Sequence, residues 1–167
     1  MEKKQLVYIL DDDPLFSFAL EIWLERQGKY IAMVFTNSKD FFDAFEGLRP
    51  DIIILDFVLG EEKTGVHNGG EVAKKIMEFD EKTPMLMLSG QKELQVAVDL
   101  FSCGIVDYIV KDDAFHTHLT CALLRLEQMQ KLKTEIAKLK VQSNTQIRRL
   151  AIVAAITLIF WIIVGVV

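Results

Sequence analysis

The chain has 167 residues, of which 51% are hydrophobic, and carries a formal net charge of −5. This length leaves room for one globular domain and a shorter appended segment, so a second enzymatic domain would not fit. Residues 128–149 contain six Lys or Arg against one Glu, and residues 150–167 contain no charged side chain. The acidic charge is therefore concentrated in residues 1–127, which argues against nucleic-acid binding by the domain.

Short apolar segments alternate with segments of helical periodicity through the acidic part of the chain. The predicted strands are Leu6–Leu10, Ile31–Phe35, Ile52–Leu55, Met85–Leu88 and Ile105–Val110. The predicted helices follow them, after Asp13, over Ser38–Glu46, Gly70–Phe79 and Lys92–Phe101, and from about Asp112 onward. This alternation predicts an α/β fold in which a five-stranded parallel, doubly wound sheet has helices on both faces.

The first predicted helix has clear start and stop signals. Asp13 is suited to cap it, Pro14 fits its first position, and Gly28 follows its end. Its predicted apolar stripe consists of Leu15, Phe18, Ala19 and Ile22.

The fifth helix is predicted to continue beyond the end of the domain as a basic linker over residues 128–149. Its apolar residues recur at spacings of three and four, at Leu119, Leu123, Leu126, Met129, Leu132, Ile136 and Leu139. Two interpretations stay open for this pattern: a solvated amphipathic linker helix, or a parallel coiled coil in a homodimer.

Residues 150–167 predict a C-terminal transmembrane helix. As an α-helix this uncharged segment is about 27 Å long, close to the thickness of a hydrocarbon core. A buried core helix is the alternative, but a domain of five strands and five helices has no place to bury it. Arg148, Arg149 and the preceding lysines would hold the domain at the cytoplasmic face and attract anionic lipid. The predicted segments are therefore a domain over 1–127, a linker over 128–149 and a single-pass anchor over 150–167.

Acidic residues follow the predicted first and third strands at their carboxyl ends. Asp11 and Asp12 come directly after the first strand, and Asp56 ends the third. Because doubly wound sheets bind ligands at this edge, we expect these carboxylates to converge. Their mutual repulsion and hard oxygen ligands suit Mg²⁺, which also binds phosphate oxygens.

The fourth and fifth strands end on residues that suit phosphoryl chemistry. Ser89 follows the fourth strand and Lys111 follows the fifth. A lysine can pair with one phosphoryl oxygen and a serine hydroxyl can donate to another. Each residue alone has an ordinary explanation, such as a surface lysine, but their order on successive strands predicts a phosphoryl-transfer site.

Over residues 4 to about 127 the chain resembles a response-regulator receiver domain, which has a flavodoxin-like fold. The resemblance implies that Mg²⁺ binds Asp11, Asp12, Asp56 and the backbone carbonyl of Val58. Asp56 then corresponds to the phosphoacceptor of the family.

The same resemblance assigns three further roles. Lys111 corresponds to the family's invariant lysine and Ser89 to its switch hydroxyl. Tyr108 corresponds to the aromatic residue whose rotamer follows phosphorylation.

The sequence departs from the family pattern at the loop beside Asp56 and after Lys111. Gly60 stands where proline is usual, Glu61–His67 looks like an insertion, and Asn68 replaces the usual aspartate before Gly69. Asp112 replaces a common proline. None of these changes removes a residue of the predicted site.

The resemblance implies a phosphoacceptor that takes a phosphoryl group from a sensor histidine kinase or a histidine phosphotransfer protein and then binds a downstream protein. No separate catalytic output domain is expected. One alternative is a degenerate receiver that serves as a membrane-anchored binding module without phosphotransfer. Another is a Mg²⁺-dependent phosphatase, but Val58 stands where that class needs a second aspartate.

Overall fold

The computed structural model describes residues 3–60, 68–90 and 103–164. The chain divides into two compact units, Met1–Ala122 and Leu123–Val167. The predicted insertion Glu61–His67 and the predicted helix over Lys92–Phe101 lie outside the described residues.

The first unit contains a five-stranded parallel sheet, as predicted. Its strands are β1 (Gln5–Leu10), β2 (Tyr30–Phe35), β3 (Ile52–Asp56), β4 (Met85–Ser89) and β5 (Ile105–Val110). Their order in the sheet is β2-β1-β3-β4-β5. The central strands β3 and β4 are buried along their whole length, whereas the edge strand β2 alternates between buried and exposed residues in its first half. Burial on both faces explains why the central strands are almost entirely apolar.

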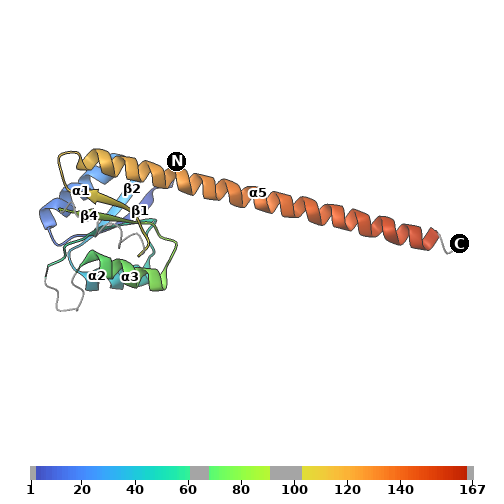
Figure 1. Cartoon of the computed structure of the whole chain (residues 1–167), viewed down its shortest axis with the longest axis horizontal. Helices are drawn as coiled ribbons and strands as arrows, with labels where there is room; N and C mark the ends of the chain where they lie inside the picture. The colour runs from blue at the N-terminus through green and yellow to red at the C-terminus, as the bar shows by residue number, and fades with distance from the viewer. Residues whose placement is uncertain (1–2, 61–67, 91–102, 165–167) are drawn as a thin grey trace. The chain divides into compact units, whose positions relative to one another are not determined.

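Helices cover both faces of this sheet. They are α1 (Pro14–Arg26), α2 (Ser38–Gly47), α3 (Gly69–Phe79) and α5 (Phe115–Val164). Figure 1 shows α2 and α3 on one face, with α1 and the first turns of α5 on the other. Asp13, Asn37 and Asn68 cap the first three helices, because each side chain accepts a hydrogen bond from a backbone N–H of the first turn.

Helix α1 buries a different face from the one predicted. Leu15 and Phe18, which were expected in the apolar stripe, are 81% and 59% exposed. The buried residues are instead Ser17, Leu20 and Leu24. Apolar residues occur almost all around this helix, so their pattern alone did not define which side faces the sheet.

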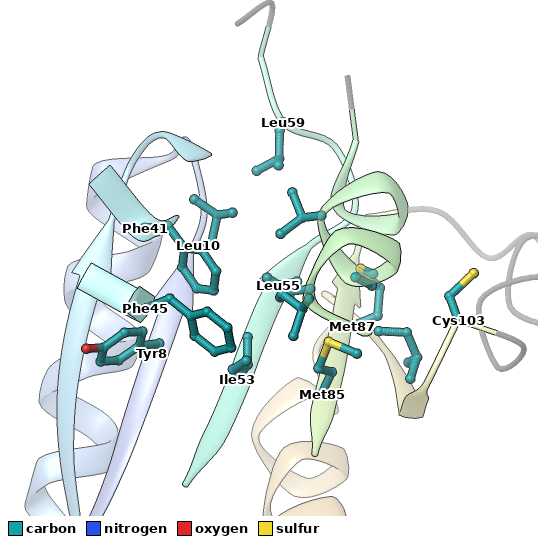
Figure 2. Packing of buried hydrophobic residues seen from close by; sticks show 14 residues of the cluster. Tyr8, Leu10, Phe41, Phe45, Ile53, Leu55, Leu59, Met85, Met87 and Cys103 are labelled. Atoms are coloured by element: carbon teal, nitrogen blue, oxygen red, sulfur yellow. The ribbon is translucent and has the colours of Figure 1, made fainter. Parts of the chain in front are cut away.

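A large apolar cluster fills the space between the sheet and helices α2 and α3 (Figure 2). Strand residues such as Tyr8, Ile53 and Met85 pack there with Phe41 and Phe45 of α2. Burial of each large apolar side chain contributes roughly 1.5–3 kcal/mol. This packing holds the strands in one register and so positions the residues at their carboxyl ends.

The predicted membrane anchor is wrong. Within the described parts of the chain, no helix is long and apolar enough to cross a membrane. The predictions of a transmembrane helix over residues 150–167 and of a location at the cytoplasmic face of a membrane are therefore not supported.

Candidate functional site

The register of the parallel sheet gathers the predicted site residues at one edge. Leu10 lies opposite Leu55, and Asp56 lies opposite Leu88. Asp11 therefore follows β1 beside the end of β3. The strand order reverses its direction between β1 and β3, and such a switch point is where doubly wound sheets place their ligands.

Three carboxylates meet at this edge. One oxygen from each of Asp11, Asp12 and Asp56 lies within 4.8 Å of the others. Asp11 and Asp56 are buried, while Asp12 is exposed. The backbone N–H of Asp13 donates to Asp11 Oδ1 at 2.9 Å, which orients that carboxylate.

Lys111 joins two of these carboxylates from the end of β5. Its Nζ donates to Asp11 Oδ2 at 2.8 Å and lies 3.1 Å from Asp56 Oδ1. Its backbone N–H donates to the carbonyl of Ser89 at 2.8 Å, which ties it to β4. A single ammonium thus balances part of the charge of two buried carboxylates.

Burial shifts the pKa of Asp56. Loss of solvation raises the pKa of this carboxyl from 3.8 to about 6, Lys111 opposes the increase, and Asp11 adds to it. A carboxylate whose charge is only partly balanced gains from additional positive charge, such as that of a metal ion.

Two glycines allow the backbone to approach the site closely. The N–H of Gly60 donates to Asp12 Oδ2 at 2.9 Å, and a Cβ at this position would lie 2.9 Å from the same oxygen. A Cβ at Gly69 would collide with the backbone carbonyl of Asp56. The proline usual in the family could not donate as Gly60 does, because proline has no backbone N–H.

Phe16 is a residue that the sequence did not reveal. Lys111 Nζ lies 4.2 Å from the centre of the Phe16 ring, which in turn contacts the ring of Phe115. A cation over an aromatic face is attracted electrostatically. Phe16 therefore helps to hold the lysine in position, and only the packing of α1 against the start of α5 indicates this.

The remaining predicted residues belong to β4, β5 and the loop after β3. Ser89 is fully buried and follows Leu88, the neighbour of Asp56 in the sheet. Tyr108 packs against the apolar cluster of Figure 2. Val58 forms an isolated bridge with Asn68 in the loop after β3 and is 51% exposed.

The donor set of the cluster fits a small divalent cation. Mg²⁺ prefers oxygen ligands at about 2.1 Å in an octahedron, which places neighbouring ligand oxygens about 3 Å apart and opposite ones about 4.2 Å apart. The three carboxylate oxygens, within 4.8 Å of one another, are close to that arrangement. Asp11, Asp12 and Asp56 are the residues that would hold the ion.

Comparison with known families and proteins agrees with this geometry. The response regulator receiver domain family matches residues 7–120. The chemotaxis protein CheY of Thermotoga maritima is 26% identical over 105 residues, which cover 63% of this chain and 83% of CheY. The transcriptional regulatory protein AfsQ1 of Streptomyces coelicolor is 33% identical over 103 residues, 62% of this chain and 43% of AfsQ1.

The regulatory protein AtoC of Escherichia coli is 24% identical over 139 residues, 83% of this chain. The alignment covers only 29% of AtoC. The chain thus spans less than half the length of AtoC and AfsQ1 but most of CheY.

Solved structures show the same fold. A CheY-like receiver domain from Methanospirillum hungatei has a TM-score of 0.67 and 19% identity, covering 77% of this chain and 98% of that one. A response regulator protein from Burkholderia pseudomallei, solved with a phosphorylated aspartic acid, calcium ion and citrate, has a TM-score of 0.63 and 19% identity, covering 78% and 73%. By its family match, its sheet topology and the residues at its sheet edge, this chain belongs to the response regulator receiver domain family.

Proposed function

We propose that this receiver accepts a phosphoryl group on Asp56 in the presence of Mg²⁺, from a sensor histidine kinase or a histidine phosphotransfer protein. The observation that carries the proposal is the position of Lys111 Nζ, 2.8 Å from Asp11 Oδ2 and 3.1 Å from Asp56 Oδ1. The ammonium lies where it could pair with an oxygen of a phosphoryl group on Asp56.

In the proposed reaction an Asp56 carboxylate oxygen attacks the phosphorus of phosphohistidine in line. The new P–O bond forms as the P–N bond breaks, and the imidazole leaves with the electron pair and takes up a proton. Mg²⁺ bound by Asp11, Asp12, Asp56 and the Val58 carbonyl would neutralise charge on the transferred group. The protein's own contribution is positional and electrostatic, because its charged groups are already in place.

The acyl phosphate is then expected to exchange contacts with its neighbours. Lys111 would move its ion pair from Asp56 to a phosphoryl oxygen, and the Ser89 hydroxyl would donate to another. Tyr108, packed against the apolar cluster, would change its rotamer as the end of β4 adjusts. In this way phosphorylation would shift the population between two states that bind a downstream protein differently.

The test is phosphorylation of the Asp56→Asn variant with acetyl phosphate and Mg²⁺. The wild-type chain should acquire a label that hydroxylamine removes, as expected of an acyl phosphate, and Asp56→Asn should acquire none. Asp43→Asn is the matched control, because Asp43 is an exposed aspartate of α2 paired with Lys39. Labelling of Asp56→Asn at the wild-type level would refute the assignment, and no labelling of the wild type would favour a binding module without phosphotransfer.

A further inference from the structure

The second unit exposes apolar side chains along one continuous helix. Helix α5 runs from Phe115 to Val164 without interruption. Exposed apolar residues of its middle part include Met129 (45%), Leu132 (58%), Ile136 (52%), Leu139 (58%), Leu150 (69%) and Val153 (58%), and also Val141 (66%), Ile147 (60%) and Ile152 (59%). A single helix in water gains little stability from its own backbone, so these residues favour a partner that covers them.

The first six of these residues, Met129 to Val153, follow a coiled-coil register, whereas Val141, Ile147 and Ile152 lie at positions f, e and c. With Met129 at position a of a heptad, the a positions are Met129, Ile136, Ser143 and Leu150. The d positions are Leu132, Leu139, Gln146 and Val153. The spacing alternates between three and four with a mean of 3.5, which keeps one stripe facing a neighbouring helix in a left-handed supercoil.

The charges beside this stripe indicate which partner covers it. Glu135 occupies position g and Lys140 occupies the next position e, and both are exposed. In a parallel pair of identical helices in register, position g of one helix faces the following position e of the other. Glu135 of each copy would then meet Lys140 of the second copy, and symmetry provides this contact twice. In an antiparallel pair, position g of one helix faces position g of the other, so Glu135 and Lys140 would not meet.

From this register and this charge pair we infer that residues Met129–Val153 form a parallel, in-register two-stranded coiled coil with a second copy of this chain. The polar Ser143 and Gln146 interrupt the apolar seam, which lowers its stability and disfavours shifted registers. Beyond Val153 exposed apolar residues such as Ile156, Ile159 and Phe160 surround the helix, so that end defines no register.

The first experiment compares seam and outer-face variants of the full-length chain by analytical ultracentrifugation. The wild type should sediment as a concentration-dependent dimer. Ile136→Asn, at a seam position, should weaken dimerisation by about ten-fold or more, because it places an amide in the apolar seam. Val141→Asn is the matched control at outer position f, 66% exposed, and should leave the dimer unchanged. A monomeric wild type, a larger oligomer, or equal effects of both substitutions would overturn the inference.

The second experiment tests direction and register through charge reversal. Glu135→Lys and Lys140→Glu should each weaken the dimer several-fold, because each places like charges opposite one another. The double variant should restore dimerisation. Residues 135 and 140 are five apart on one helix and do not face each other there, so restoration must come from contact between copies.

Lys138→Glu, at outer position c, makes the same charge change away from the seam and should have little effect. If the double variant stays as weak as the single ones, the parallel register is wrong. Circular dichroism of each variant checks that helix content is retained. Association is measured without Mg²⁺ or a phosphoryl donor, so its outcome is independent of the phosphorylation test.

Discussion

Three consecutive carboxylates in this chain have three different surroundings. Asp11 is fully buried and paired with Lys111, Asp12 is exposed and accepts a hydrogen bond from Gly60, and Asp13 caps α1. Identical side chains differ here because the chain turns from the end of a strand into a helix within these three residues. Only the first two can reach Asp56 and a shared cation.

The raised pKa of Asp56 predicts a pH-dependent stability. The folded-state pKa of Asp56, about 6, lies above the ordinary value of 3.8. The contribution of Asp56 to the free energy of unfolding is therefore fully present below about pH 4 and is lost as the pH rises through about 6. Asp56→Asn removes this charge. In the absence of metal, it should raise the free energy of unfolding at pH 7.5 by about 1–2 kcal/mol relative to wild type.

Urea denaturation in EDTA at several pH values measures this difference. The advantage of Asp56→Asn should shrink toward zero between pH 6 and pH 4. Addition of Mg²⁺ should stabilise the wild type and leave the variant nearly unchanged, because a ligand stabilises the state that binds it. If Asp56→Asn is less stable than the wild type at pH 7.5 without metal, the charged Asp56 does not destabilise the fold, and the proposed effect of its burial is wrong.

Gly60 is expected to control metal affinity through Asp12. A Cβ at this position would lie 2.9 Å from Asp12 Oδ2, so Gly60→Ala should displace that carboxylate. We expect Mg²⁺ affinity to fall by about ten-fold, the lower end of the effect typical of a lost hydrogen-bond partner of a metal ligand. Isothermal titration with Mg²⁺ measures it. Gly47→Ala, where a Cβ would meet nothing within 4 Å, is the control and should bind as the wild type does.

At the level of elements, the loops after β1 and β3 each supply a residue of the site and a helix cap. β1 leads through Asp11 and Asp12 to the cap Asp13, and the loop after β3 leads through Gly60 to the cap Asn68. The caps start the helices, and the strand ends position the reactive groups. Residues only a few positions apart therefore have separate roles: the caps stabilise the helices, and the residues at the strand ends take part in the chemistry.

Asp13→Ala tests this separation. Asp13 Oδ1 accepts hydrogen bonds from Leu15 N at 2.9 Å and Phe16 N at 3.1 Å. Their loss should lower the free energy of unfolding by about 1 kcal/mol, as for other helix caps. The rate of labelling by acetyl phosphate should stay within about two-fold of wild type.

Urea denaturation and the labelling assay measure the two effects. Asp43→Ala removes an exposed ion pair instead of a cap and should lower the free energy of unfolding much less than Asp13→Ala does. Labelling lost to the same degree as in Asp56→Asn would show that Asp13 takes part in the reaction itself.

At the level of the whole molecule, the site residues all belong to the first unit and the coiled-coil seam to the second. Asp11, Asp56 and Lys111 lie within Met1–Ala122, whereas Met129–Val153 lies within Leu123–Val167. Phosphorylation chemistry should therefore be insensitive to association through the seam.

The full-length Ile136→Asn variant checks this independence. Its initial rate of labelling by acetyl phosphate should equal that of wild type within about two-fold at equal concentration of chains, because the substitution leaves every group of the site in place. A rate lowered ten-fold or more would show that the site depends on the second copy.

Much of the fold and the position of the site could be read from the amino-acid order. Strands buried on both faces must be short and apolar, so Ile52–Asp56 and Met85–Ser89 were recognised to within one residue. Parallel strands end at one edge, so the meeting of Asp11, Asp56 and Lys111 followed from their places at strand ends. These features depend on local pattern and on the topology that the pattern implies.

Other features depend on which surfaces meet, and the tertiary structure alone decided them. Apolar residues occur around most of α1, so only packing showed that Ser17, Leu20 and Leu24 are buried. The ring of Phe16 over Lys111 and the Gly60 amide on Asp12 join residues 95 and 48 positions apart. The membrane span predicted over residues 150–167 was wrong, because no helix in the described part of the chain is both long enough and apolar enough to cross a membrane. Sequence patterns thus determined the elements and the edge where the site lies, and three-dimensional packing determined how each side chain is held there.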